Sequence, residues 1–146
     1  MIQRIQTLYL LAAAVATAVT IWLPLATTDE PMSSSALFAD SQFTATDHPA
    51  LVGLLGLASL ASLITIFLYR NRPLQLRLSV VSMLATILAL IIAMALYLNE
   101  ARSLTDLNTK EGWGIALPVL AIVLWAMAQR RIRKDEALVR AMDRLR

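Results

Sequence analysis

Two long apolar runs joined by a short basic connector constrain the fold of this chain more than any other feature. The runs cover residues 50–69 and 78–98, and the connector carries Arg70, Arg72 and Arg77. A helix needs about 20 residues to cross the hydrocarbon core of a bilayer, so each run is long enough to span it. Short loops rich in arginine stay on the cytoplasmic side. The pattern predicts a helical hairpin that crosses the membrane twice, with its connector in the cytoplasm.

Two further apolar segments flank this hairpin, at residues 5–25 and 113–129. A signal peptide is the alternative interpretation of the first segment, but the apolar run exceeds the roughly 7–15 residues of a signal h-region. Hydrophobic residues make up 58% of the chain and the mean hydropathy is +0.66, outside the range of a water-soluble fold. We therefore expect an all-α membrane protein, a single domain of four transmembrane helices over residues 1–146.

Charged residues divide unequally between the two predicted sides of the membrane. One side carries eleven Lys and Arg residues against three acidic residues, a balance of +8, and the other carries two against seven, a balance of −5. Together these balances give the formal net charge of +3. Because basic loops are retained in the cytoplasm, the asymmetry predicts that both termini are cytoplasmic. The high pI follows from this division rather than from one basic face, so we expect no nucleic-acid partner.

The first outer segment, residues 26–49, is polar and acidic. Within it, residues 36–39 and 42–45 contain strand-forming residues on either side of the turn formers Asp40 and Ser41. This pattern predicts a small β-hairpin in the first outer loop.

Two prolines predict helix starts, because proline is favoured in the first helical turn. Pro49 follows Asp47 and His48, one of which we expect at the N-cap, and Pro73 would open the helix after the connector. Tryptophans near the two ends of the fourth apolar segment, Trp113 and Trp125, are interpreted as interfacial anchors.

The fourth apolar segment continues into a basic sequence without glycine or proline, residues 130–146. We predict one helix that runs from about Gly114 into the cytoplasm. Its residues Leu138, Met142 and Leu145 would fall on one face, which could be covered by the membrane surface, the arginine connector or a partner helix. A frayed, solvated tail is the alternative.

Small residues recur at intervals of three along the second apolar run. Such a face usually allows another helix to approach closely, so we expect helix packing at Gly53, Gly56, Ser59 and Ser62. The alternative is a permeation path for a neutral or lipid-like solute. Its predicted lining comprises Ser59, Ser62, Thr65, Ser79, Ser82 and Thr86.

Several kinds of chemistry have no residues to support them. The four apolar segments contain no Asp, Glu, Lys, Arg or His, which argues against ion-coupled transport, because such carriers usually hold an ionisable residue at depth. There are no cysteines, and His48 is the one histidine in the sequence, at a predicted helix end, so we expect no metal and no haem or other cofactor. No triad or phosphate-binding motif is present, and we expect no enzyme activity.

Three parts of the chain resemble a known family: MIQRIQTLYLL at residues 1–11, NRPLQLRL at 71–78, and the ending from IRKDEALVR at 132–140 to DRLR at 143–146. They resemble an uncharacterised family of small four-span inner-membrane proteins of Gram-negative bacteria, catalogued only as a domain of unknown function. The resemblance implies four helices, both ends inside, and a multi-pass protein of the bacterial inner (plasma) membrane. It implies no activity and no catalytic residues.

All three of these parts lie at the predicted cytoplasmic face, so we expect this face to be the working surface. The leading hypothesis is a non-enzymatic accessory or scaffold subunit of a larger membrane complex, and the alternative is a small carrier or channel for a neutral or lipid-like solute. We expect membrane lipids as partners, together with either a protein partner or further copies of the chain. The predicted cytoplasmic contact residues are Arg4, Arg70, Arg72, Arg77, Arg130, Arg131, Arg133, Lys134, Leu138, Met142 and Leu145.

Overall fold

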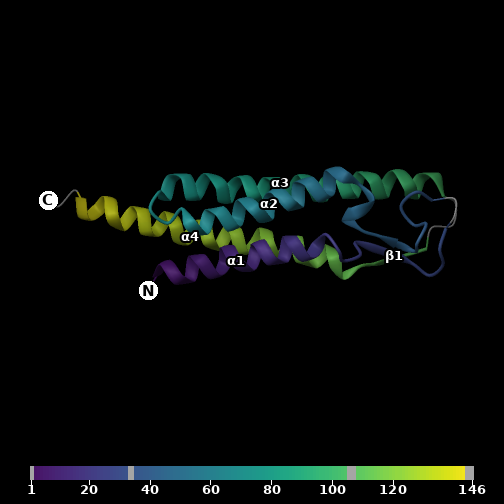
Figure 1. The fold of residues 1–146 in the computed structure, drawn as a ribbon, viewed down its shortest axis with the longest axis horizontal. Helices are drawn as coiled ribbons and strands as arrows, with labels where there is room; N and C mark the ends of the chain where they lie inside the picture. Colours follow the sequence, from purple (N-terminus) through teal and green to yellow (C-terminus); the bar gives the residue numbers. More distant parts are fainter. Residues whose placement is uncertain (1, 33–34, 105–107, 144–146) are drawn as a thin grey trace.

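The computed structural model describes residues 2–32, 35–104 and 108–143, and its helices form an elongated antiparallel bundle (Figure 1). The chain runs up and down the bundle. Each helix packs along the next one in sequence, and the last helix also packs along the first. The helices are α1 (Ile2–Thr20), α2 (Pro49–Phe67), α3 (Arg72–Ser103) and α4 (Ala116–Asp143).

The two ends of the bundle differ in structure (Figure 1). One end holds both termini and the short turn between α2 and α3, and we call it the basic end because it contains the arginine connector. The other end holds the two long loops and a small β-sheet, and we call it the sheet end. The C-terminal part of α4 projects beyond the other helices at the basic end.

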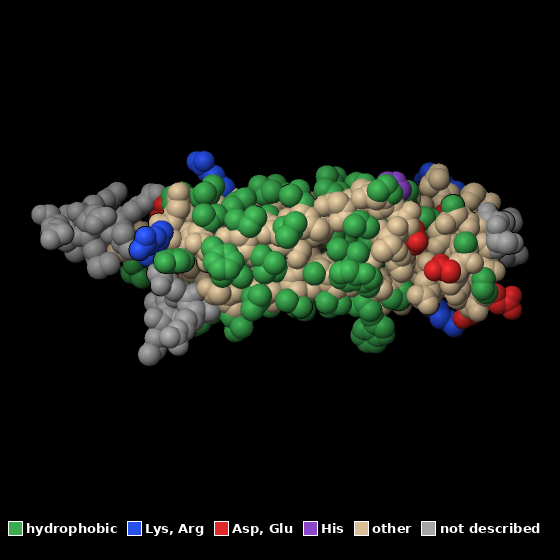
Figure 2. Space-filling view, viewed as in Figure 1, with side chains coloured by type: hydrophobic (Ala, Val, Ile, Leu, Met, Phe, Trp, Pro, Cys, Tyr) green, Lys and Arg blue, Asp and Glu red, His purple; other side chains and the backbone are tan. Residues whose placement is uncertain are grey.

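Three helices in the described residues, α2, α3 and α4, are long and apolar enough to cross a membrane, and α1 is a shorter apolar helix. Large hydrophobic side chains are exposed along the sides of the bundle between its charged ends (Figure 2). A surface of this kind is costly in water and suited to lipid. These features indicate a multi-pass membrane protein.

The sequence predicts a first span that ends at residue 25, whereas α1 ends at Thr20. The backbone NH groups of Ile21 and Trp22 bond to carbonyls in the preceding turn, each at 3.2 Å, which closes the helix. The backbone NH of Leu25 then donates to Phe43 at 2.7 Å and directs the chain into the sheet. Residues 21–25 are apolar but form the turn from α1 to the sheet.

A three-stranded antiparallel sheet covers the sheet end, in the order β2-β1-β3. Its strands are β1 (Ala26–Thr28), β2 (Gln42–Phe43) and β3 (Thr109–Glu111). A hairpin in the first outer loop is therefore present, but the partner of β2 is β1 rather than residues 36–39, which form bends and turns. The third strand comes from the second outer loop and pairs with β1 along its whole length.

Two glycines allow the chain to cross itself where α1 leads into β1. A Cβ on Gly112 would lie 2.0 Å from the carbonyl oxygen of Pro24, and a Cβ on Gly114 would lie 2.6 Å from the same atom. Their NH groups use the close approach, since Gly112 donates to Leu25 at 3.0 Å and Gly114 to Pro24 at 2.9 Å. Any side chain at either position would force the two backbones apart.

The helix α3 extends to Ser103, beyond the predicted limit of residue 98, because the first outer loop packs on its last turns. The carboxylate of Glu100 accepts hydrogen bonds from the hydroxyl of Ser35 and from the backbone NH of Ala36, the latter at 3.0 Å. Next to this anchor, the ring of Phe38 is fully buried.

Both proline-marked helix starts are confirmed. His48 is the N-cap of α2, with Nδ1 accepting a hydrogen bond from the NH of Ala50 at 3.3 Å and Pro49 in the first turn. Asn71 caps α3 in the same way, since its side-chain oxygen accepts from Leu74 at 3.3 Å. Each cap satisfies an NH that the helix itself leaves without a partner.

Candidate functional site

The basic half of the bundle interior contains a hydrogen-bonded polar network instead of a purely apolar core. Its members are buried hydroxyl, amide and indole side chains from three helices: Ser59, Ser62, Thr65, Gln75, Ser79, Trp125 and Gln129. None of them is ionisable in its ordinary range. Most of their bonds link neighbouring helices, whereas the hydroxyl of Thr65 donates to the carbonyl of Ala61 within α2.

Trp125 lies at the centre of this network and is fully buried. Its indole NH donates to the hydroxyl of Ser62 at 3.0 Å, and that hydroxyl donates to the backbone carbonyl of Leu10 at 2.9 Å. One turn away, Ser59 donates to the carbonyl of Ala14 at 3.0 Å. Ser62 thus joins its own helix, α2, to α4 and to α1.

The interpretation of Trp125 as an interfacial anchor is wrong, whereas Trp113 is 84% exposed at the sheet end, as an anchor requires.

Two glutamines attach α3 to the rest of the bundle. The amide of Gln75 donates to the backbone carbonyl of Thr65 at 3.2 Å, next to the turn between α2 and α3. The amide of Gln129 donates to the hydroxyl of Ser79 at 3.4 Å. A buried amide without a partner costs about 1–3 kcal/mol, so both contacts favour this particular arrangement of helices.

Asp135 gathers three separate parts of the chain at the basic end. Its carboxylate accepts a hydrogen bond from the amide of Gln6 in α1, and its backbone carbonyl accepts one from the guanidinium of Arg72 in α3 at 3.0 Å. The N-terminal segment, the connector and the C-terminal helix, which the sequence marked as separate motifs, therefore meet at one residue. Arg72 is partly buried in this junction, so it holds helices together and is not a free docking residue.

The remaining described cations of the basic end are exposed. An ion pair between Lys110 and Asp29 lies at the opposite, sheet end of the molecule. Leu138, on the projecting part of α4, is 51% exposed and uncovered. The exposed cations are Arg70, Arg77, Arg130, Arg131, Arg133 and Lys134.

Three of the predicted contact residues cannot be placed. The side chains of Arg4 and Met142 and the whole of Leu145 lie outside the described part of the structure. Of the predicted apolar stripe, only Leu138 is therefore observed. Ile132, which the stripe did not include, is almost fully buried against the bundle.

The four predicted packing residues separate into two pairs. Ser59 and Ser62 contact α1 through the hydrogen bonds described above. A Cβ placed on Gly53 or on Gly56 would meet no atom within 4 Å. Neither glycine is therefore in a close contact within the described chain, and the prediction of helix packing at these two positions stays a prediction.

The residues predicted to line a permeation path are buried and bonded. Ser59, Ser62, Thr65, Ser82 and Thr86 donate to backbone carbonyls, and Ser79 accepts from Gln129. In the described residues, every buried side-chain nitrogen and oxygen has a hydrogen-bond partner. Ser59, Ser62 and Ser79 join helices, whereas Thr65, Ser82 and Thr86 bond within their own helices, and all six side chains are buried.

Metal-binding chemistry finds no support among the described residues, where no three His, Cys, Asp or Glu side chains are grouped closely enough to hold an ion. The ring of His48 already uses Nδ1 to cap α2.

The sequence did not predict the interhelical contacts made by four residues: Gln6, Gln75, Gln129 and Asp135. Glutamines placed at the ends of apolar spans were the available signal, since a buried amide in lipid needs a protein partner.

A comparison with protein families matches residues 2–145 to one family, described as Domain of unknown function (DUF4293). The match covers nearly the whole chain, both loops and the projecting part of α4 included. No curated protein matches the sequence.

Proposed function

Because the chain belongs to the DUF4293 family, whose description assigns no activity, we propose from its own geometry that it is a non-enzymatic scaffold subunit of a larger membrane complex. In this proposal the exposed cations of the basic end bind an acidic surface of a partner protein. The four helices hold that surface at a defined place on the membrane. The membrane concerned is the bacterial inner membrane, with α1 as a fourth, shorter span.

The charge distribution supports a cytoplasmic location for the basic end. The turn between α2 and α3 carries Arg70, the first two turns of α3 add Arg72 and Arg77, and α4 adds further cations from Arg130 to Lys134. Short basic segments next to apolar spans are retained on the cytoplasmic side. In this orientation both termini are cytoplasmic and the sheet lies on the opposite side of the membrane.

The observation that carries the proposal is the contrast between satisfied interior groups and exposed surface groups. Inside the bundle, polar side chains are used for helix-to-helix hydrogen bonds. On α4, next to the junction at Asp135, Arg131, Arg133 and Lys134 are exposed, and Leu138 further along the same helix is 51% exposed. Such a surface is suited to an acidic partner, because opposite charges guide encounter and an apolar residue adds contact area.

The carrier alternative receives less support. It needs a polar path across the bundle, and the hydroxyls predicted for that path are hydrogen-bonded within the described interior. Separating the helices to open a path would break the bonds that Ser59, Ser62 and Ser79 make between helices. Each broken bond would leave a polar group in a medium without water, which is costly.

Charge reversal on α4 tests the scaffold proposal. The membrane complex is extracted gently from cells that express either the wild type or the triple variant Arg131→Glu, Arg133→Glu, Lys134→Glu, and its native mass is measured. We expect the wild type at a defined mass above the 16.0 kDa of the chain and the variant at a lower mass, with partner recovery reduced about tenfold or more.

The matched control conserves the charge, with Arg131→Lys and Arg133→Lys beside the unchanged Lys134, and should retain most of the partner. Recovery of the chain alone, or equal partner recovery from the reversed variant, would overturn the proposal. So would a reversed variant that loses bound anionic lipid while its protein composition stays the same, because the cations would then serve only lipid headgroups, at about 1 kcal/mol each.

A further inference from the structure

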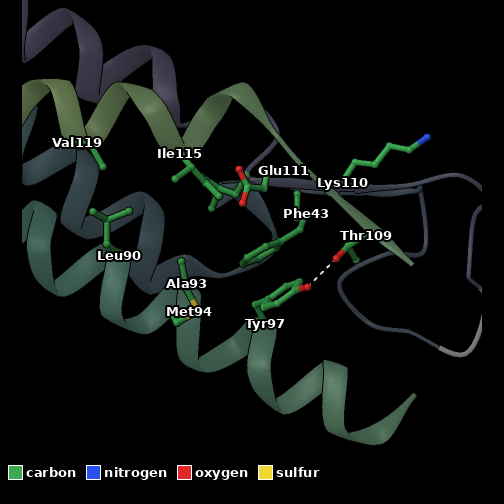
Figure 3. Close-up of a pocket in the computed structure, with 12 residues that line it drawn as sticks. Phe43, Leu90, Ala93, Met94, Tyr97, Thr109, Lys110, Glu111, Ile115 and Val119 are labelled. Atoms are coloured by element: carbon green, nitrogen blue, oxygen red, sulfur yellow. Dashed lines mark hydrogen bonds between the residues drawn. The ribbon is translucent and has the colours of Figure 1, made fainter. Parts of the chain in front are cut away.

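A cavity of about 470 Å³ lies at the sheet end, between α3, α4 and the sheet (Figure 3). This volume is within the range of about 300–1,000 Å³ that small-molecule sites occupy. It is separate from the polar network and from the basic end. Its lining residues are Leu25, Ala26, Phe43, Leu90, Ala93, Met94, Tyr97, Thr109, Lys110, Glu111, Ile115 and Val119.

The cavity reaches from the membrane interface into the apolar part of the bundle. Tyr97 lies seven residues beyond Leu90 on α3, which is about 10 Å along a helix, and its hydroxyl bonds to that of Thr109 in the sheet at 2.6 Å. On α4, Val119 lies six residues beyond the exposed Trp113, or about 9 Å deeper. The inner part of the cavity therefore lies within the leaflet of the sheet end, and its mouth lies at the headgroups.

The walls of the inner part are apolar and open toward lipid. Met94 and Val119 line the cavity from α3 and α4, and both are about half exposed on the side of the bundle. The exposed half of each side chain is not covered by another part of the described chain. In a bilayer the hydrocarbon around this opening contains no water. Any group that enters the groove from the lipid must therefore be apolar.

The mouth carries one unpaired charge, and it is negative. Lys110 points away from the cavity (Figure 3) and forms an ion pair with Asp29. The carboxylate of Glu111 points toward Ile115 at the mouth, and in the described residues no hydrogen bond or ion pair is made by it. A carboxylate at the membrane interface favours a cationic hydrogen-bond donor as its partner.

We propose that this cavity binds an amine-headed phospholipid, with one acyl chain along Leu90, Met94 and Val119 and the headgroup ammonium on Glu111. The two requirements come from different parts of the cavity. The apolar groove selects an acyl chain, and the free carboxylate selects a primary ammonium over a phosphoglycerol or a quaternary headgroup. The proposal does not depend on the scaffold function, because it involves the other end of the molecule.

Native mass spectrometry of the purified full chain tests this site with three defined lipids of equal chain length. These are phosphatidylethanolamine, phosphatidylglycerol and phosphatidylcholine, each added at the same concentration. We expect one retained phosphatidylethanolamine per chain and about tenfold less retention of the other two, because neither of them can donate a charge-assisted hydrogen bond from a primary ammonium to Glu111. Equal retention of all three lipids would overturn the proposal.

Two variants with matched controls separate the acyl contact from the headgroup contact. Val119→Trp should fill the groove and reduce lipid retention about tenfold, whereas Val123→Trp, at a residue that is equally 49% exposed but outside the cavity, should not. Glu111→Gln should remove the preference for phosphatidylethanolamine, whereas Glu30→Gln in the first loop should keep it. Circular dichroism melting checks that each variant is folded.

Two outcomes would contradict this assignment even with folded variants. If Val119→Trp retained the lipid as the wild type does, the acyl chain would bind elsewhere. If the lipid-free wild type were a dimer and Val119→Trp a monomer, the occupant of the groove would be a second copy of the chain.

Discussion

The two halves of the bundle are packed by different means. At the sheet end, aromatic rings from the loops and α3 form the core: Phe38 is fully buried and makes edge-to-face contacts with Phe43 and Tyr97, at ring-centroid distances of 6.3 and 6.5 Å. At the basic end, alanines and Leu10 surround Trp125, and hydrogen bonds of the polar network join the helices.

The difference follows from the solvent on each side. Loops at the sheet end face water, so burying aromatic rings there gains the full hydrophobic contribution. Between helices within lipid, apolar side chains gain little from burial, because the lipid tails are equally apolar. Close alanine contacts and interhelical hydrogen bonds then provide the attraction, and the basic half has both.

The largest expected effect is the removal of an aromatic ring at the sheet end. Phe38→Ala should lower the free energy of unfolding by about 3–5 kcal/mol, because it leaves a large cavity in the core beneath the outer loops. Unfolding of the detergent-solubilised protein in a denaturant series, followed by circular dichroism, measures the change. Phe67→Ala is the control, at a ring that is 79% exposed on α2, and should change stability by less than about 0.5 kcal/mol. A similar loss in both variants would show that the loop layer is not a core.

An intermediate effect is expected from the polar network. Ser62→Ala removes both the acceptor for Trp125 and the donor to Leu10, so a buried indole NH loses its partner, and we expect a loss of about 1–3 kcal/mol in the same assay. Ser59→Ala is the matched control on the same helix. Ser59 only donates to Ala14, and we expect a loss of about 0.6 kcal/mol, the average for interhelical bonds in membranes. Equal losses would mean that Trp125 gains nothing from Ser62.

The smallest expected effect has the opposite sign. Gly53→Ala places a methyl group where no atom lies within 4 Å, so it should raise the free energy of unfolding by about 0.5–1 kcal/mol through helix propensity alone. The reverse substitution at an exposed site of α3, Ala95→Gly, should lower it by a similar amount. Destabilisation by Gly53→Ala, measured in the same denaturant series, would instead reveal a close contact between this face of α2 and another copy of the chain.

Helix positions and the charge division could be predicted from the sequence, whereas the contacts of single residues mostly could not. The apolar run at 50–69, the cap at His48 and the first-turn proline Pro73 led directly to the observed α2 and α3. Residues 21–25 are as apolar as the span before them, and only the pairing of Leu25 with Phe43 shows that they turn instead. The three-residue spacing of small residues likewise could not distinguish Gly53, around whose Cβ position no atom lies within 4 Å, from Ser62, which bonds to α1.

By itself, the sequence determined which segments are apolar enough for a membrane and which end of the molecule is basic, because hydropathy and charge are properties of each segment taken alone. The tertiary structure decided what each polar side chain does. Trp125 lies in the interior and is not an interfacial anchor, because the hydroxyl of Ser62, 63 residues earlier in the sequence, accepts a hydrogen bond from its indole NH. Among the described residues Glu111 forms no ion pair, whereas its neighbour Lys110 pairs with Asp29. Both outcomes depend on which helices and strands become neighbours, since a buried or interfacial polar group takes its role from the group across from it.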